Sequence, residues 1–260
     1  MTDWIALIEE DGRWRALRVD GLGAITDSRT NPSPRPLLAQ ADPQTEVVLA
    51  AASIGIETRA LPCTPLPEGA WPVAEVGERS LPALPGLMQK RPAEPITPPE
   101  AARIAGILAG APHFDGVIWI CGATALWAHI SAGEVVSATR AGSAAMLAAL
   151  GAPLRAGADF DAAVSDALSR PERASRDLAE QALTGQSSRA AGAVLGLELA
   201  AARPWWLGQS VLALTSPTAP GWGEVCLRAL QSQGAQVTLG DGEAALIAGL
   251  AQARHPKEHP

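Results

Sequence analysis

The sequence predicts an α/β protein with two domains. The 260 residues are enough for two domains of ordinary size, and a hydrophobic fraction of 47 % supports a substantial core. Strand patterns open both halves, as a hairpin near residue 10 and as a three-strand meander from residue 116. Strands and helices alternate toward the C-terminal end, which is typical of parallel strands connected by helices.

The first half begins with a predicted hairpin. Apolar runs at 4–8 and 14–19 indicate two strands, and Asp11 and Gly12 form a dipeptide that short hairpin turns favour. Prolines make 30–36 a linker without helix or central strand. The remaining elements that we expect are a buried strand at 46–52 and, within the proline-rich chain from 60 to 99, one short strand at 79–84.

A helix is predicted to follow Thr97 and to separate the two halves. Thr97 is a candidate N-cap, Pro98 would take the first helical position, and Glu100 is spaced to complete a capping box. This helix should reach about Gly110. We therefore expect domains at 1–110 and 111–260.

The second half opens on the meander, with strands expected at 116–122, 126–130 and 135–139. Gly122 and Gly142 mark two backbone turns that we expect near each other at one end of this sheet. Ser143 is a candidate N-cap for a helix over 144–150. Bare glycine backbone lets N–H groups approach phosphate oxygens, although spacing alone favours two tight turns without a ligand.

Helices and strands then alternate to the end of the chain. Within the long apolar helix, Gly192 and Gly196 lie one turn apart, a spacing that permits another element to approach closely. A meander followed by a βα unit, after a similar opening hairpin in the first half, indicates two ribonuclease-H-like domains around a cleft. The predicted helices are 160–168, 174–183, 187–202, 224–233 and 243–254, and the predicted strands are 211–215 and 235–239.

Composition narrows the classes of function. A net charge of −7, with Lys90 and Lys257 as the two lysines, argues against a nucleic-acid surface or a basic membrane-binding face. The sequence contains no apolar run of membrane-spanning length, and acidic residues flank the first apolar run, unlike in a signal peptide. Three cysteines without a CxxC pair indicate buried thiols, so we expect a cytoplasmic protein.

Four groups of residues, taken in their order along the chain, carry a family resemblance. They are 47–50 before Gly55, 84–87 before the Glu100 helix, 120–127, and 234–238 with 248–249. Their order resembles the 2-dehydro-3-deoxygalactonate kinase family of actin-like sugar kinases. The resemblance implies transfer of the γ-phosphoryl group of ATP, with a divalent metal such as Mg²⁺, to the 6-hydroxyl of a 2-keto-3-deoxy sugar acid.

The resemblance also implies residue roles. The residues that it assigns to sugar-acid binding are Glu100, Gly122, Trp127 and Gly142, and those that it assigns to the nucleotide are Gly12 and Arg15. Asp11 falls where a carboxylate would bind metal or accept the hydroxyl proton, and Arg140 is a candidate phosphate clamp. The four histidines do not show the spacing of metal ligands.

The chain departs from the family pattern at four motifs. Where the family has Asp-Trp-Gly-Thr/Ser, this chain has Ile-Glu-Glu-Asp at 8–11. Of the family's Pro-Gly-Thr-His-x-Lys-Trp motif, this chain keeps the glycine, as Gly122, and the tryptophan, as Trp127, but not the histidine or the lysine. Of the family's Arg-Gly-Glu-Glu helix start, this chain keeps one glutamate, Glu100, and of its Met-Thr-Gly-Glu turn it keeps the glycine, Gly142. Either the chain is a divergent kinase, or it is a catalytically inactive sugar-acid-binding or interaction protein. Phosphoryl transfer depends on electrostatic stabilisation, so the lost polar groups favour the second alternative.

The same residues have structural explanations. Asp11 suits a hairpin turn, Glu100 suits a helix cap, and Trp127 suits the core. His129 lies in an alternating strand and is expected to be half exposed rather than a base. Residues 203–206, with two adjacent tryptophans, form either a surface patch for a partner or, as we expect, buried packing.

Overall fold

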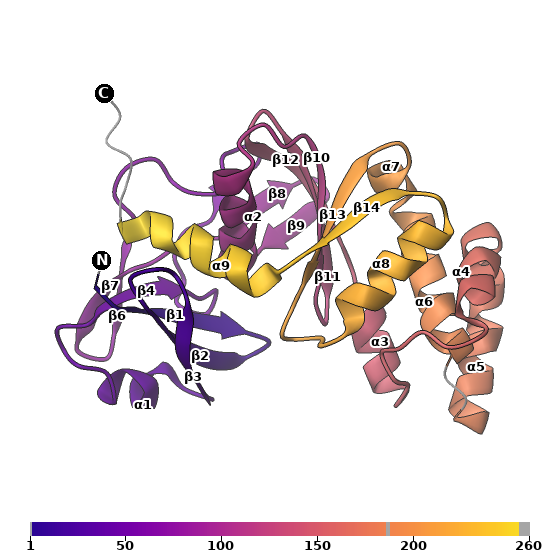
Figure 1. Cartoon of the computed structure of the whole chain (residues 1–260), viewed down its shortest axis with the longest axis horizontal. Helices are drawn as coiled ribbons and strands as arrows, with labels where there is room; N and C mark the ends of the chain where they lie inside the picture. Colours follow the sequence, from indigo (N-terminus) through magenta and orange to yellow (C-terminus); the bar gives the residue numbers. More distant parts are fainter. Residues whose placement is uncertain (1, 186–187, 255–260) are drawn as a thin grey trace. The chain divides into compact units, whose positions relative to one another are not determined.

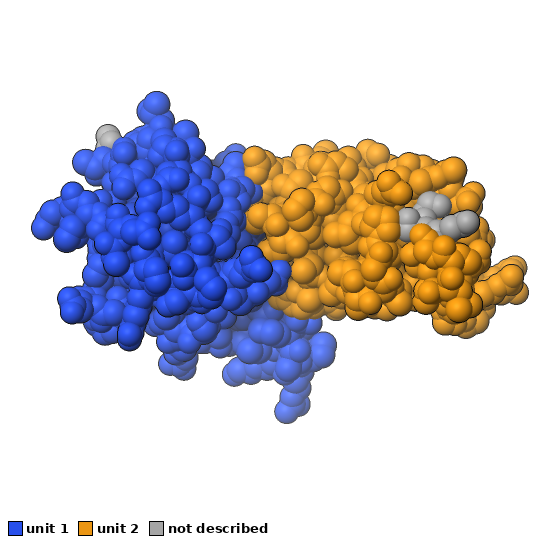
Figure 2. All heavy atoms as spheres, turned by 90° about the horizontal axis from the view of Figure 1, so that it is seen from below, with its two compact units in different colours: residues 1–114, 132–136, 243–260 blue, residues 115–131, 137–242 orange. Residues whose placement is uncertain are grey.

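The computed structural model describes residues 2–185 and 188–254, and the chain forms two compact units (Figure 2). Unit 1 contains residues 1–114, 132–136 and 243–260, and unit 2 contains residues 115–131 and 137–242. The closing segment therefore groups with the N-terminal residues, so the units are not two consecutive stretches of chain. The domain boundary expected at residue 110 stays a prediction.

Unit 1 is built on a four-stranded sheet with the order β3-β2-β1-β4 (Figure 1). Strand β1 pairs antiparallel with β2, which pairs antiparallel with β3, and β1 pairs in parallel with β4. One core cluster joins Leu7 and Leu49 of the sheet to Leu38 of helix α1. The bounds are β1 Trp4–Glu10, β2 Arg13–Val19, β3 Ile25–Asn31, α1 Pro34–Ala39 and β4 Glu46–Ala50.

The linker predicted at 30–36 is wrong, because β3 ends and α1 begins within it. Ser33 is the N-cap of α1, and Pro34 and Pro36 fall in the first helical turn. A proline there breaks no helical hydrogen bond, since the first N–H groups of a helix have no partner within it. Strand β3 was not predicted, because it is mostly exposed and its sequence lacks the alternation of apolar and polar residues that indicates a strand.

The proline-rich stretch forms five short strands in two small sheets. Strand β7 confirms the strand predicted at 79–84, and the other four strands were not predicted. Pro82 of β7 and Pro95 of β9 lie in edge strands, where a missing N–H is tolerated. The sheets are β5 (Arg59–Ala60), β8 (Leu87–Lys90) and β9 (Ala93–Ile96), and β6 (Val73–Val76) with β7 (Arg79–Pro82).

Helices α2 (Pro98–Gly110) and α9 (Gly242–Ala251) pack closely within unit 1. A Cβ atom on Gly106 would lie 1.9 Å from the carbonyl oxygen of Ala245, and one on Gly249 would lie 1.9 Å from that of Ala102. Both glycines therefore set the distance between the helices. A short 3-10 turn, Gln252–Arg254, follows α9.

Unit 2 repeats the strand order of unit 1 in a five-stranded sheet, β12-β11-β10-β13-β14 (Figure 1). Strand β10 pairs antiparallel with β11, which lies next to β12. On its other side β10 pairs in parallel with β13, and β13 pairs in parallel with β14. This repetition confirms the predicted pair of ribonuclease-H-like sheets. The strands are β10 Gly116–Cys121, β11 Ala125–Ser131, β12 Glu134–Ala141, β13 Ser210–Thr215 and β14 Gln236–Gly240.

Helices α6 and α8 share one core with β10 and β13. Gly192 and Gly196 of α6 allow the predicted close approach, since Cβ atoms there would lie 2.5 Å from the Phe160 oxygen and 2.6 Å from the Val164 oxygen of α4. Ser187, the predicted start of α6, lies outside the described residues, as do His255 and His259. The helices are α3 Ser143–Ala149, α4 Phe160–Ser169, the 3-10 turn Pro171–Arg173, α5 Ala174–Thr184, α6 Ser188–Ala201, α7 Arg203–Trp206 and α8 Trp222–Ser232.

Cys63, Cys121 and Cys226 are free thiols. The last two are buried as predicted, whereas Cys63 is half-buried. Across residues 2–185 and 188–254, each helix is too short or too polar to cross a bilayer.

Candidate functional site

The β1–β2 turn carries the first group of predicted site residues. Asp11 and Gly12 form the turn, as expected, and both have positive φ, at 50° and 70°. This conformation suits glycine and is tolerated by aspartate. The two residues before the turn lie at the end of β1, and one of them, Glu9, accepts a hydrogen bond from the backbone N–H of Ser53. The turn thus places the carboxyl group of Asp11 at an exposed tip.

Arg15, predicted to bind nucleotide, lies in a network of ion pairs within unit 1. Its guanidinium donates to both carboxylate oxygens of Glu243 at 2.9 and 2.8 Å. Another of its nitrogens lies 3.6 Å from Glu10, which accepts a 2.5 Å hydrogen bond from the buried Arg103. Paired charge-assisted bonds of this kind fix side-chain orientation. The network ties the β1–β2 hairpin to the middle of α2 and to the start of α9.

Glu100 completes the predicted capping box at the start of α2. Its carboxylate accepts hydrogen bonds from the Thr97 N–H at 2.8 Å and the Thr97 hydroxyl at 2.9 Å. The structural explanation of Glu100 is therefore confirmed, while its contact with a sugar acid stays a prediction.

In unit 2, the turn after β10 packs tightly on the loop after β13. A Cβ atom on Gly122 would lie 3.1 Å from the Thr218 hydroxyl and 3.2 Å from the Thr124 carbonyl oxygen. The Ala123 N–H donates to the Thr218 hydroxyl at 3.1 Å, and this hydroxyl lies 2.9 Å from that of Ser216. Glycine at 122 therefore keeps the backbone close to two hydroxyl groups.

The two predicted glycine turns of unit 2 do lie together. The Ala145 N–H in the first turn of α3 donates to the Ala123 carbonyl at 3.0 Å, and Arg140 donates to the Thr124 hydroxyl at 3.3 Å. Gly142, not Ser143, is the N-cap of α3, so the predicted cap is wrong. Ser143 is buried, and its hydroxyl donates instead to Glu198 of α6.

Sequence reasoning missed Glu198, whose carboxylate organises the interior of unit 2. One of its oxygens accepts hydrogen bonds from the indole N–H groups of Trp119 at 3.0 Å and Trp127 at 2.8 Å, and the other accepts from Ser143. Both indoles are fully buried and stack with centroids 4.2 Å apart. A lone glutamate in an apolar helix was the available signal.

Burial raises the pKa of the Glu198 carboxyl above its ordinary value, and the hydrogen bonds from Ser143, Trp127 and Trp119 oppose that shift. Glu198 joins α6 to β10, to β11 and to the first turn of α3. It thereby fixes the strand ends that flank the Gly122 turn. Trp127 has the packing role that the sequence also indicated, and its contact with substrate stays a prediction.

A sequence profile of the family described as 2-keto-3-deoxy-galactonokinase matches residues 10–253. A search of curated proteins found no match.

Solved structures share the fold over nearly the whole chain. One is a Sinorhizobium meliloti protein described as a 2-dehydro-3-deoxygalactonokinase, with a TM-score of 0.76, 18 % identity, and 96 % of this chain and 97 % of that chain covered. Another is the activator of 2-hydroxyisocaproyl-CoA dehydratase from Clostridium difficile with bound ADPNP. Its TM-score is 0.53 at 10 % identity, with 99 % of this chain and 96 % of that chain covered. A third is component A of (R)-2-hydroxyglutaryl-CoA dehydratase from Acidaminococcus fermentans. Its TM-score is 0.54 at 9 % identity, with 99 % of this chain and 100 % of that chain covered. These similarities confirm the actin-like α/β fold.

Proposed function

This chain belongs to the 2-keto-3-deoxy-galactonokinase family, and on that premise we propose that it transfers the γ-phosphoryl group of ATP to the 6-hydroxyl of a 2-keto-3-deoxy sugar acid. The family match over residues 10–253 is the observation that carries the proposal. The reaction needs a carboxylate near the acceptor hydroxyl and cationic groups near the phosphates. Both kinds of group are present among the predicted site residues.

Asp11 is the proposed acceptor of the hydroxyl proton or ligand of Mg²⁺. It lies at an exposed turn, directly after Glu9 and Glu10, whose carboxylates are bonded to Ser53 and Arg103. A magnesium ion bound mainly through phosphate oxygens needs one or two protein carboxylates, so a single aspartate suits it. Bound metal would neutralise charge on the phosphates, which otherwise would be repelled by this acidic hairpin.

Arg140 is the proposed phosphate-contacting cation of unit 2. It reaches the Thr124 hydroxyl beside the Gly122 turn, and both glycine turns lie within this group of residues. An arginine held by a neighbouring hydroxyl stabilises charge on phosphate oxygens without large reorganisation. Gly12 and Arg15 keep their proposed nucleotide roles, and Glu100, Gly122 and Gly142 keep their proposed sugar-acid roles. Trp127 is fully buried and bonded to Glu198, so its proposed part in sugar-acid binding is to support the neighbouring Gly122 turn.

A binding protein without catalysis is the second candidate, and the ion-pair network favours it. Arg15 is engaged by Glu243, and Arg103 is engaged by Glu10. In a kinase, arginines near the phosphate-binding hairpin would be expected to face the nucleotide. Here their charge is balanced by carboxylates of the protein itself.

One assay separates the two candidates. Purified protein is incubated with ATP, MgCl₂ and 2-keto-3-deoxygalactonate, and phosphorylated sugar acid is measured by ³¹P NMR. We expect product, and we expect Asp11→Asn to lower kcat by about 100-fold or more, since a lost proton acceptor typically costs that much. Asp3→Asn, at another exposed aspartate, should leave kcat unchanged.

The melting temperature reports binding independently of turnover. A rise with the sugar acid alone, without product and without a further rise from ATP, would support the binding protein. Product formation that Asp11→Asn leaves unchanged would retain the kinase and remove Asp11 from its proposed role.

A further inference from the structure

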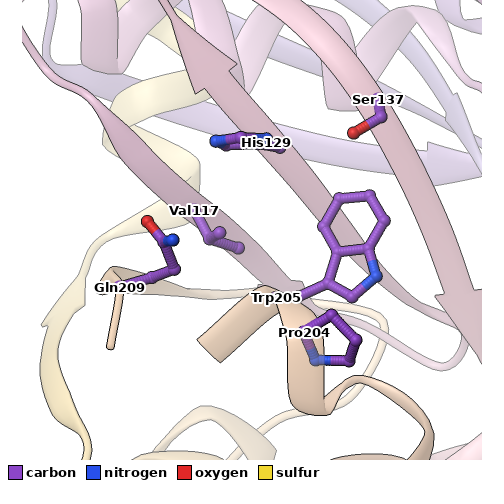
Figure 3. A pocket seen from close by; sticks show the side chains of 6 residues that line it. All are labelled: Val117, His129, Ser137, Pro204, Trp205 and Gln209. Atoms are coloured by element: carbon purple, nitrogen blue, oxygen red, sulfur yellow. The ribbon is translucent and has the colours of Figure 1, made fainter. Parts of the chain in front are cut away.

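A cavity of about 270 Å³ lies in unit 2, and its lining contains no residue of the Gly122 or Gly142 turn. Figure 3 shows its lining side chains. Its floor is the sheet, where Val117 of β10 pairs with His129 of β11. This pair follows the Trp119–Trp127 pair along the same two strands. Helix α6 ends at Ala201, beyond which α7 supplies the opposite wall. The six lining residues are Val117, His129, Ser137, Pro204, Trp205 and Gln209.

The two tryptophans of α7 have different environments. Trp206 is 3 % exposed, and its N–H donates to the Leu199 carbonyl at 2.8 Å, so it anchors α7 to α6. Trp205 is half-buried and borders the cavity, with its ring meeting that of His129 edge-on at 6.5 Å between centroids. The expectation of buried packing is therefore confirmed for Trp206. Trp205 retains an accessible aromatic surface.

The polar side chains around the cavity have unused hydrogen-bonding capacity. Within the described part of the chain, the His129 imidazole, the Ser137 hydroxyl and the Gln209 carboxamide make no hydrogen bond to protein. Together they offer both donors and acceptors. In Figure 3 the His129 ring and the Ser137 side chain lie on the sheet side, across from Gln209 and Trp205. A ligand placed among them would find polar partners on more than one side.

The lining selects the chemistry of that ligand. It contains no lysine, arginine, aspartate or glutamate, so it provides neither the paired cations typical of phosphate sites nor carboxylates for a cation. The volume lies just below the range of drug-sized pockets, about 300 to 1,000 Å³. An indole wall with a rim of mixed donors and acceptors suits a small molecule that has one apolar face and several hydroxyl groups.

We propose that this cavity, the His129–Trp205 cavity, is a binding site for a neutral monosaccharide. The apolar face of the sugar ring packs on Trp205, and its hydroxyl groups bond to His129, Ser137 and Gln209. The site is separate from the proposed phosphoryl transfer, because its ligand carries no carboxylate and its residues have no role in that reaction.

Isothermal titration of the full-length protein with D-galactose and D-glucose, without nucleotide, tests the proposal. We expect saturable binding of at least one sugar with a Kd on the order of 1 mM or below, as suits a ligand of this size. Trp205→Ala should weaken binding at least tenfold. Gln209→Ala, which removes a polar group without changing a packed side chain, should weaken it several-fold.

Matched variants control for nonspecific effects. Trp71→Ala, at a half-buried tryptophan of unit 1, and Gln231→Ala, at an exposed glutamine of α8, should leave the Kd unchanged. Absence of saturable binding of both sugars up to about 50-fold above the expected Kd would overturn the proposal. So would binding that survives both Trp205→Ala and Gln209→Ala, or D-galactonate binding as tightly as D-galactose.

Discussion

Replacing Glu198 by leucine will lower the free energy of unfolding by roughly 3–5 kcal/mol, because three buried donors lose their acceptor at once. The indole N–H groups of Trp119 and Trp127 and the hydroxyl of Ser143 all point at this carboxylate. Leucine has a similar volume but no acceptor. Urea unfolding followed by tryptophan fluorescence measures the loss, since two of the affected groups are indoles.

Glu198→Gln separates hydrogen bonding from charge. The amide keeps one carbonyl acceptor for the indoles, and its NH₂ group can donate to the Ser143 oxygen, so we expect a loss below about 2 kcal/mol. Glu180→Leu and Glu180→Gln, at an exposed position of α5, should change stability by less than about 0.5 kcal/mol. Equal losses for Glu198→Leu and Glu180→Leu would contradict the assigned network.

The raised pKa of Glu198 gives the wild type a pH dependence that Glu198→Gln lacks. A folded-state pKa above the unfolded value means that the folded protein retains the proton longer as the pH rises. The wild type therefore loses stability relative to Glu198→Gln as the pH rises from the ordinary glutamate pKa, about 4.3, toward the folded-state pKa. Urea titrations of both proteins between about pH 4 and 8 test the sign. A free energy of unfolding of the wild type that rises relative to that of Glu198→Gln as the pH rises would contradict it.

Replacing Gly106 by alanine will destabilise unit 1 by about 3 kcal/mol or more, because the new Cβ has no space. It would lie 1.9 Å from the Ala245 carbonyl oxygen and 2.7 Å from the Ala245 carbonyl carbon. Both are backbone atoms, so relief requires that α9 move as a whole, at the upper end of the cost of overpacking a core. Urea unfolding followed by circular dichroism measures the change.

Gly110→Ala is the matched control on the same helix. A Cβ atom there meets nothing within 4 Å, so stability should be unchanged or raised by up to about 1 kcal/mol. Combining Gly106→Ala with Gly249→Ala should cost less than the sum of the single losses, because one displacement of α9 accommodates both Cβ atoms. A neutral Gly106→Ala would show that α2 and α9 are not packed through these glycines.

Local chemistry in the sequence predicted much of the fold. The Asp11–Gly12 turn, the Thr97–Glu100 capping box and the close approach at Gly192 and Gly196 each depend on residues only a few positions apart. Such signals act before tertiary structure forms. Gly122 and Gly142 were also recognised, because a hairpin that returns to its starting edge brings its ends together.

Long-range pairing explains what the sequence did not reveal. The donors to Glu198 lie 55 to 79 residues away, so the helix pattern alone gave no reason for its burial. Likewise, Arg15 meets Glu243 across 228 residues. Proline at 34, 36 and 95 was taken as a barrier to regular structure, yet these residues occupy a first helical turn or an edge strand, where proline is compatible.

The membership of α9 in unit 1 has a consequence for how the chain folds during its synthesis. Unit 2 is encoded entirely before residue 243, whereas the α2 surface around Gly106 is covered by a helix that is synthesised after the whole of unit 2. Domains of nascent chains commonly fold in the order of translation. Here unit 2 can be completed before unit 1, because unit 1 lacks α9 until the residues up to 251 have been synthesised.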